Sequence, residues 1–437
     1  MIVRLRALWE AINASYWFYP ALFALGAVLV SSTTIWFDRN GAAEILSRVD
    51  WLTPSRPQGA RALLSLIAAS MIGVAATVFS ITIAAVAYAS GTYGPRLLTN
   101  FMEDRGNQLS LAVFIATFVH ALLVLRVVRG EDEEAISLGG AVGTSTPGFV
   151  PQLSILVAFG LTMISVVVLV YLLHHIPSSI RINKVIEQIG CRLIASIKGR
   201  FPKSGDAEHV QEPLNGTPVI AADHGYITLI DFATLDAIAE KHGAVVGLPL
   251  RTGDFVHGAV TLLHWRGPDL DDETEEKLRG CFAIGSSRSP HQDIDYMIDE
   301  LVEIALRALS PGINDPFTAI AALDWLGAAT AELSRRSLDR GPEQDDYDRT
   351  RVKPVADGFN HYLERGFGSA LRSVASSDVA AAKFIGIVES MLPAAANAER
   401  RAMLLALVDR LLALAEIALE RPTFVRLESR CSILPAV

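Results

Sequence analysis

Cysteine is scarce in this sequence, with three residues among 437, at Cys191, Cys281 and Cys431. They are widely separated and form no C-x-x-C pair, so they predict neither a disulfide framework nor a cysteine metal site, and they suit a reducing compartment. The sequence also lacks a Walker loop, an H-E-x-x-H motif and a G-x-S-x-G motif. No catalytic constellation is recognised, so an enzyme is the least favoured class, and no cofactor and no metal are expected.

Positive charge is in deficit as well. The chain carries 38 Lys and Arg against 47 Asp and Glu, which gives a formal net charge of −9 at pH 7. This balance provides no general basic surface, so nucleic acid is not expected among the partners. A cleavable signal peptide is not evident, because the first apolar run, from about Tyr16, lacks an A-x-A-like cleavage site.

Charged residues are missing altogether from residues 62–88. That run is longer than the roughly 20 apolar residues needed for a helix that crosses a bilayer. Three more apolar runs, over about residues 15–37, 109–128 and 153–176, bring the predicted number of spanning helices to four. The sequence therefore predicts a multi-pass protein whose residues 1–176 form a four-helix transmembrane domain in a lipid bilayer.

The basic residues that flank the four runs predict the orientation, because Lys and Arg are enriched in cytoplasmic segments. Ten belong to the N-terminus, the second connection and the segment after the fourth run: Arg4, Arg6, Arg96, Arg105, Arg181, Lys184, Arg192, Lys198, Arg200 and Lys203. Six lie on the opposite side: Arg39, Arg48, Arg56, Arg61, Arg126 and Arg129. This bias predicts that the N- and C-termini are both cytoplasmic.

Small residues in the second run recur at alternating steps of three and four, which places them on one face of a helix. We call this face the seam, and it consists of Ser70, Gly73, Thr77, Ser80, Ala84, Ala87 and Gly91. Two interpretations remain open. Small residues allow close helix–helix packing, and a face with three hydroxyls is also suited to line a narrow pore.

The pattern changes after the fourth run. Residues 177–215 are predicted to form a basic amphipathic helix and a polar linker, and residues 216–268 to form a small β-module. Its expected elements are strands at 217–220, 226–230, 244–250 and 260–264, with a helix at 232–242. The turn Gly253-Asp254-Phe255-Val256 resembles the turn of biotinyl/lipoyl-like barrel-sandwich domains, although the carrier lysine is missing.

Residues 269–437 are predicted to form a helical bundle with an extended tail, because their apolar residues recur at helical spacing. The expected helices cover residues 271–282, 294–309, 316–334, 346–376, 378–391 and 397–419, and the tail begins at Thr423. The predicted fold class is therefore a membrane α-helical protein followed by a cytoplasmic α+β region. That region contains the barrel-sandwich-like module and the bundle.

The sharpest local motif is a turn between two expected helices. Asp315 is a natural N-cap there, and Pro316 suits the first helical position. Capping alone explains Asp315; the alternative is a polar pocket that binds an anion at the helix N-terminus. The residues of this candidate pocket are Arg307, Ser310, Asn314, Asp315 and Thr318.

Two further features combine charge with helical spacing. Asp295, Asp299 and Glu303 form an acidic stripe at steps of four, which indicates either a solvated face or an acidic vestibule that concentrates cations. His120 lies inside the third run, where an ionisable side chain is a functional candidate. A neutral histidine that is hydrogen-bonded across helices is the alternative.

Several strings together resemble one family. These are the four spans, the exit His174-His175-Ile176-Pro177, the turn Gly253-Asp254-Phe255-Val256 and the string Ala308-Leu309-Ser310-Pro311-Gly312-Ile313-Asn314-Asp315-Pro316. They resemble the domain of unknown function 2254 family of bacterial predicted membrane proteins over nearly the whole chain. The resemblance implies a bacterial inner-membrane protein and implies no particular activity.

Two classes of function follow as hypotheses. The first is a homo-oligomeric channel or pore, in which a ring of seams conducts inorganic ions and the remaining chain forms a cytoplasmic collar. The second is a membrane-anchored sensor or scaffold that binds a ligand or partner through the pocket around Asn314 and Asp315.

Overall fold

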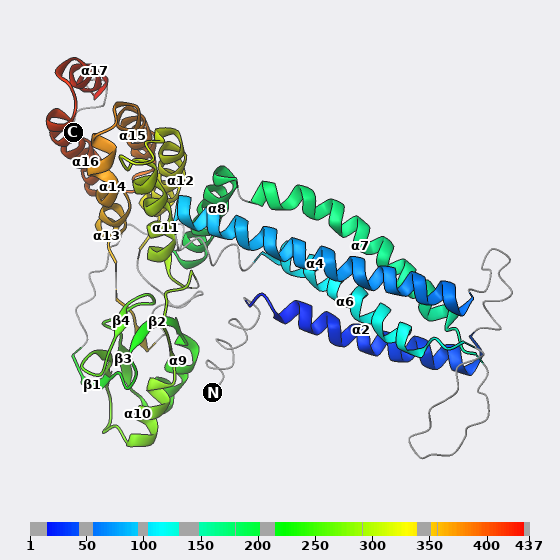
Figure 1. Ribbon diagram of the computed structural model, residues 1–437. Helices are drawn as coiled ribbons and strands as arrows, with labels where there is room; N and C mark the ends of the chain where they lie inside the picture. Colours follow the sequence, from blue (N-terminus) through cyan, green and yellow to red (C-terminus); the bar gives the residue numbers. More distant parts are fainter. Residues whose placement is uncertain are drawn as a thin grey trace. The chain divides into compact units, whose positions relative to one another are not determined.

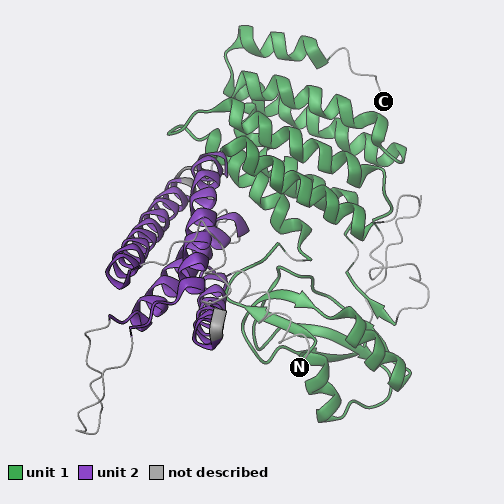
Figure 2. Cartoon of the chain, turned by 90° about the vertical axis from the view of Figure 1, so that its right-hand side faces the viewer, with its two compact units in different colours: residues 1–10, 92–95, 181–437 green, residues 11–91, 96–180 purple. Residues whose placement is uncertain are grey.

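The computed structural model describes residues 15–42, 56–94, 104–130, 148–179, 181–201, 215–290, 292–338, 351–355 and 357–431. It divides into two compact units (Figure 2): residues 11–91 with 96–180, and residues 1–10 with 92–95 and 181–437. We call them the membrane unit and the C-terminal unit. Several segments of the sequence lie outside the described residues, among them the N-terminus with Arg4 and Arg6, residues 43–55, the acidic residues 131–134, most of the predicted linker and residues 432–437.

The membrane unit consists of long apolar helices (Figure 1), which are α2 (Phe18–Phe37), α4 (Pro57–Tyr93), α6 (Arg105–Val127) and α7 (Gln152–Ser179). A short π-helix, η1 (Asp38–Ala42), continues α2. By length and composition, four helices of the described chain are able to cross a membrane. The prediction of four apolar membrane helices is therefore confirmed.

Helix α6 packs against both α2 and α7. Its buried Phe114, Ala121 and Val124 belong to one apolar core with Leu64 and Met71 of α4. Only one face of α4 contributes to this core. Its buried residues are Leu64, Ile67, Met71, Ala75 and Val78, and the positions opposite them are exposed. The membrane unit thus buries most of α6 but only one side of α2, α4 and α7, and it leaves broad apolar surfaces outside, as expected for a protein solvated by lipid.

The C-terminal unit contains two small sheets that share one core. The first has the order β1 (Thr217–Ile220), β5 (Thr261–Arg266), β3 (Val245–Gly247) and β7 (Val352–Lys353), and the second has β4 (Phe255–Val256), β2 (Gly225–Ile230) and β6 (Phe282–Gly285). All pairs are antiparallel except β3 with β7. Helices α9 (Phe232–His242) and α10 (Asp272–Arg279) lie between strands of these sheets in the chain order.

The remaining elements are helical. They are α8 (Ile182–Arg200), α11 (Ile294–Ala308), α12 (Pro316–Ser334), α13 (Phe359–Leu363), the π-helix η2 (Glu364–Gly368), α14 (Ser369–Ala375), α15 (Asp378–Met391), the 3₁₀ turn η3 (Leu392–Ala394), α16 (Ala398–Ala418) and α17 (Arg421–Cys431). Side-chain caps start several of them, including Asp293 for α11, Asp315 for α12 and Asn397 for α16. A helical region with small sheets therefore follows the membrane helices, as predicted in outline.

Three predictions for this region were wrong in detail. The expected helix 271–282 ends at Arg279, and Phe282 starts strand β6 beside β2. Of the expected helix 346–376, residues 352–353 form β7 and the helix begins only at Phe359, because Val352 is buried in the sheet core and pairs with Val246. The tail expected to be extended is helical over Arg421–Cys431, since Phe424 and Leu427, three residues apart, are both buried.

Candidate functional site

The seam lies on the exposed side of α4. Every seam residue, Ser70, Gly73, Thr77, Ser80, Ala84, Ala87 and Gly91, is exposed. A methyl group added at Gly73 would meet nothing within 4 Å. The three hydroxyls donate to carbonyls of their own helix, with oxygen–oxygen distances of 3.0, 2.9 and 2.9 Å for Ser70, Thr77 and Ser80. Their oxygen lone pairs therefore remain on the exposed face of the helix.

A buried polar cluster joins α2, α6 and α7 in the membrane unit. We call it the membrane cluster, and it consists of Ser31, Thr34, Asp38, His120 and Ser154. The His120 ring is fully buried, with Nδ1 2.8 Å from Ser31 Oγ and Nε2 3.1 Å from the carbonyl oxygen of Ser154. His120 therefore connects the neighbouring helices α2 and α7, as the hydrogen-bonded alternative for this residue expected.

The geometry around His120 limits where its protons lie. A carbonyl accepts only, so Nε2 carries a proton and donates to Ser154. In a neutral ring Nδ1 is then an acceptor and needs the Ser31 hydroxyl proton, which is also placed to donate to Ala27 O at 2.7 Å. The single Ser31 hydroxyl proton is therefore shared between His120 Nδ1 and the carbonyl oxygen of Ala27.

Asp38 is the carboxylate of this cluster and lies at the start of α7. Its two oxygens accept from the backbone N–H groups of Leu153 and Ser154 at 2.9 and 3.0 Å, and Oδ2 also accepts from Ser154 Oγ at 2.7 Å. A helix N-terminus carries about half a positive charge, which favours a carboxylate there. Asp38 was not singled out from the sequence, and its side chain is buried.

The other end of α6 is also fixed by polar contacts. Asp104 caps the helix by accepting from the N–H of Gly106 at 2.8 Å, and it pairs with His175 Nε2 of α7 at 2.9 Å. Tyr171 stacks on His175 with 5.0 Å between ring centroids. A Cβ at Gly106 would lie 2.6 Å from His175 Nε2, so the glycine permits this close approach.

Asp295 and Asp299 of the acidic stripe belong to a second buried cluster, in the C-terminal unit. We call it the ionic cluster, and it consists of Arg251, Arg288, Asp293, Asp295, Asp299, Asp357, His361 and Arg365. Asp295 is 4% exposed, and its oxygens lie 3.0 and 3.1 Å from His361 Nε2. Arg365 and Arg251 approach the same carboxylate at 3.5 and 3.6 Å. Positive groups therefore surround Asp295.

Two arginines hold the neighbouring carboxylates. Arg288 forms a fork with Asp293, at 2.8 to 3.0 Å, and donates through Nη1 to Asp299 at 2.7 Å. Arg365 makes a second fork with Asp299, at 2.8 and 2.7 Å. Arg365 lies in the π-helix η2, and such bulges in an α-helix commonly occur at functional positions. Glu303, the last residue of the stripe, pairs with Arg307 at 3.4 Å.

The predicted turn at Gly253 approaches the ionic cluster. Gly253 has φ +94°, and a Cβ there would lie 2.2 Å from Asp293 Oδ2, so this position requires glycine for both its conformation and its space. Thr252 Oγ1 donates to the carbonyl of Gln292 at 2.6 Å, and Arg251 pairs with Asp357 at 2.6 Å. The cluster thus joins the sheets to α11, α13 and η2.

The electrostatics of Asp295 follow from these contacts. Burial alone would raise its pKa, but the hydrogen bond from His361 and the positive charges of His361, Arg365 and Arg251 lower the pKa to about 2. His361 Nε2 also lies 3.0 Å from Arg251 Nη1, which only donates. We therefore infer that His361 Nε2–H donates to Asp295 and that Arg251 donates to Asp357. Such paired charges are typical of a rigid connection between the sheets and the helices, and less so of an open vestibule lined by free carboxylates.

The turn before α12 is exposed and its polar groups are used locally. Asp315 accepts from Thr318 N and Thr318 Oγ1 at 3.1 and 2.6 Å, and these bonds keep the pKa of Asp315 below its usual value. Asn314 has φ +49°, and Ser310 Oγ donates to the carbonyl of Arg307 at 2.6 Å. Beside the cap, Ile313 and Phe317 are 46% and 74% exposed.

Several members of the two clusters were not found by sequence reasoning: Asp38, Arg251, Arg288, Asp357, His361 and Arg365. Only Asp38 had a usable signal, as a carboxylate directly after an apolar run. In the described part of the chain, no group of three or more His, Cys, Asp or Glu side chains is placed to hold a metal ion.

Comparison with known proteins gives a family and uncharacterized relatives. A family model described as "Predicted membrane protein (DUF2254)" matches residues 13–389. Uncharacterized proteins of Mycobacterium bovis and of two strains of Mycobacterium tuberculosis are 29% identical over 356 residues, which is 79% of this chain. The chain covers 65% of the length of these relatives. No solved structure matches the chain.

Proposed function

The chain belongs to the DUF2254 family of predicted membrane proteins, and from that premise we propose that it is a homo-oligomeric, channel-like protein of the bacterial inner membrane. The observation that carries the proposal is the position of the seam. All seven small residues lie on the exposed side of α4, while the bulky Leu64, Ile67 and Val78 are buried against the other membrane helices. Packing inside one protomer buries these residues together with Ala68 and Ala75, and it leaves the seam outside, beside exposed apolar residues such as Ile72 and Phe79.

A second copy of α4 is the contact that fits this face best. Lipid tails are as apolar as leucine, so membrane helices associate through close backbone packing, which small residues permit. Several copies around an axis would bring the oxygens of Ser70, Thr77 and Ser80 toward one path. Hydroxyl oxygens that already donate to their own helix still accept from water or coordinate a cation. Inorganic ions are the proposed permeant species.

The C-terminal unit forms the cytoplasmic collar in this proposal. The excess of Lys and Arg beside the predicted cytoplasmic ends, ten against six, supports that orientation. Two sheets with a common core also support the likeness of the β-module to a barrel-sandwich. The ionic cluster would then hold the sheets and helices of each collar subunit as one body.

The experiment begins with disulfide trapping in the membrane. Thr77→Cys and the control Ile72→Cys, which is exposed outside the seam, are introduced into a chain whose three native cysteines are serine. Mild oxidation should give a cross-linked dimer for Thr77→Cys and little for Ile72→Cys. Equal yields at the two positions, or a monomeric mass in nanodiscs, would contradict the proposal.

Conductance tests the second half of the proposal. In planar bilayers Thr77→Phe should reduce the ion current at least tenfold, since a phenyl ring on the axis closes a narrow path, whereas Ile72→Phe should leave the current unchanged. An oligomer without current would keep the assembly and reject the channel.

The exposed turn before α12 favours a second candidate, a membrane-anchored sensor or scaffold. The observation is that Ile313 and Phe317 are exposed next to the polar groups of Asn314 and Asp315. Paired Ile313→Ser and Phe317→Ser substitutions should then abolish capture of a partner while the ion current persists. A current that disappears with unchanged assembly would instead assign the turn to the channel.

A further inference from the structure

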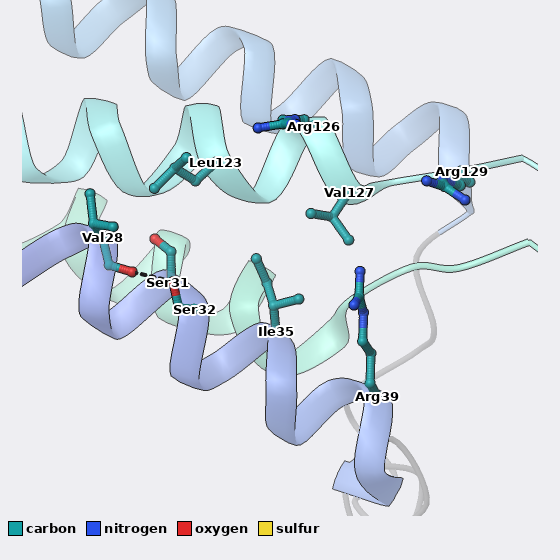
Figure 3. Close-up of a pocket in the computed structure, with 9 residues that line it drawn as sticks. All are labelled: Val28, Ser31, Ser32, Ile35, Arg39, Leu123, Arg126, Val127 and Arg129. Atoms are coloured by element: carbon teal, nitrogen blue, oxygen red, sulfur yellow. Dashed lines mark hydrogen bonds between the residues drawn. The ribbon is translucent and has the colours of Figure 1, made fainter. Parts of the chain in front are cut away.

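A cavity of about 300 Å³ opens in the membrane unit between the ends of α2 and α6. Its apolar lining is Val28, Ile35, Leu123 and Val127, and its polar lining is Ser31, Ser32, Arg39, Arg126 and Arg129. Figure 3 shows the Arg39 side chain directed from η1, which continues α2, toward the end of α6, where Arg126 and Arg129 lie. The cavity therefore has an apolar side along the two spans and a basic side at their ends.

Counted over the described residues, the charge of the cavity is positive even when the helix ends are included. Helices α2 and α6 both end here, and each C-terminus contributes about half a negative charge. Asp38 adds one negative charge, about half of which is offset by the N-terminus of α7 that it caps. Three guanidiniums exceed this total by about one to two charges. Such a surplus matches a single phosphate diester.

The three arginines are also available for an anion. Among the described residues none of them forms an ion pair with a carboxylate, and Asp38 is engaged by α7. Arg39 lies over the Phe149 ring with 5.8 Å from Cζ to the centroid, a cation–π contact that orients the guanidinium. One guanidinium group donates two parallel N–H bonds to two phosphate oxygens, which makes arginine well suited to this ligand.

We propose that this cavity binds an anionic phospholipid, with the phosphate between Arg39, Arg126 and Arg129 and the start of an acyl chain against Val28, Ile35 and Leu123. The apolar lining continues onto the exposed surface of α2, where Val28 and Leu29 are 40% and 69% exposed. A lipid fits this continuity, because its charged and apolar parts are joined in the same order as the two sides of the cavity. Basic pockets between membrane helices bind lipid headgroups on the cytoplasmic side of membranes, and in the proposed orientation this cavity would use the same chemistry at the opposite leaflet.

The test compares lipid-dependent thermal stability of the full-length protein in detergent. Added phosphatidylglycerol should raise the unfolding temperature of the wild type, and equal amounts of phosphatidylcholine should raise it less. Arg126→Gln/Arg129→Gln should weaken the apparent affinity for phosphatidylglycerol at least tenfold, the loss expected when charge-assisted hydrogen bonds are removed. The control Arg56→Gln/Arg105→Gln removes the same charge at exposed positions outside the cavity and should retain the wild-type affinity.

A second pair of variants leaves the charge unchanged. Leu123→Trp fills the apolar side of the cavity and should lower retention of phosphatidylglycerol in native mass spectrometry. Leu122→Trp, at the adjacent exposed position, should not lower it. This pair keeps the test decisive if the arginine variants fold poorly.

Three outcomes would overturn the proposal. The first is equal affinity in the arginine variant and its control. The second is full stabilisation by inorganic phosphate alone, which would identify a free anion site. The third combines two results: substitution of residues 131–134 by Gln and Asn raises the affinity for phosphatidylglycerol, and substitution of the three arginines does not change it. The lipid would then bind at another site.

Discussion

The membrane unit and the C-terminal unit both bury a polar cluster, but they do so with different amounts of charge. Around His120 the partners are hydroxyls and backbone carbonyls, with Asp38 held by backbone N–H groups. Around Asp295 the partners are guanidinium groups and an imidazole. Deleting one group from the membrane cluster removes a hydrogen bond, whereas deleting one from the ionic cluster leaves charges unpaired. Similar numbers of contacts should therefore differ several-fold in energy.

The largest effect is expected for Asp295→Asn. The substitution keeps the shape of the side chain but removes the carboxylate that bonds His361, while Arg251 keeps Asp357 and Arg365 keeps Asp299. Removing one partner from a buried charged group costs about 3–5 kcal/mol. Amide hydrogen exchange of α11 in the full-length protein should report a loss of protection of that size. A loss below about 1 kcal/mol would mean that the cluster is more solvated than its burial indicates.

Acid should sharpen the same contrast. The pKa of Asp295 is about 2 in the folded chain, below its ordinary value of 3.8. A lowered carboxyl pKa adds stability that is complete above the unfolded pKa and is lost as pH falls through the folded pKa. The shift corresponds to about 2 kcal/mol, which should be present at pH 5–7 and disappear between about pH 4 and pH 1. Chemical unfolding at stepped pH measures it, and Asp295→Asn should lack this part of the acid limb.

A smaller effect is expected in the membrane cluster from Ser154→Ala. The variant loses the hydroxyl bond to Asp38 but keeps both backbone N–H donors to that carboxylate. Hydrogen bonds between membrane helices are worth about 0.6 kcal/mol on average and up to about 1.7, so we expect about 1 kcal/mol in unfolding from mixed micelles. Ser32→Ala is the matched control, because its hydroxyl is exposed and donates only within α2. If both variants lost the same stability, the cross-helix bond would contribute nothing.

The smallest effect is expected for Asp324→Asn, which breaks an exposed pair with Lys383 at 3.0 Å in the C-terminal unit. Exposed ion pairs contribute about 0–1 kcal/mol and are screened by salt. The same Asp-to-Asn change thus has two outcomes in one unit, at carboxylates that differ in burial and in the number of positive partners. Thermal unfolding of this variant should stay close to that of the wild type, and a loss as large as that of Asp295→Asn would refute the role given to burial.

The sequence allowed the local structure to be predicted well where one helix or strand carries the signal. The four apolar runs indicated the membrane helices, and the expected strand 217–220 and the helices 232–242, 316–334 and 378–391 agree with the structure to the residue. Asp315 with Pro316 marked the start of α12 because a cap depends on neighbours three residues away. Strand β7 was missed because two residues carry no periodicity, and its assignment depends on Val246, far earlier in the chain.

The clusters were predicted only in part, since their partners are distant in sequence. His120 was identified as an ionisable residue in a span, but its contacts Ser31 and Ser154 are 89 and 34 residues away. The spacing of Asp295 and Asp299 indicated a common helix face, and helical periodicity cannot tell a solvated face from one that meets Arg365, which lies 66 residues beyond Asp299. Long-range pairing of charges is decided by the tertiary fold.

The parallel pairing of β3 with β7 has a consequence for the order in which the chain is made. Strand β7 leaves the ribosome only after α11 and α12. The edge of β3 at Val246 is therefore unpaired while those helices are being synthesised. An unpaired strand edge invites pairing with another chain. A fragment that stops at residue 268 would keep that edge open permanently, whereas one that continues through Lys353 supplies the missing strand. The small sheet is therefore complete only after α10, α11 and α12 have been synthesised.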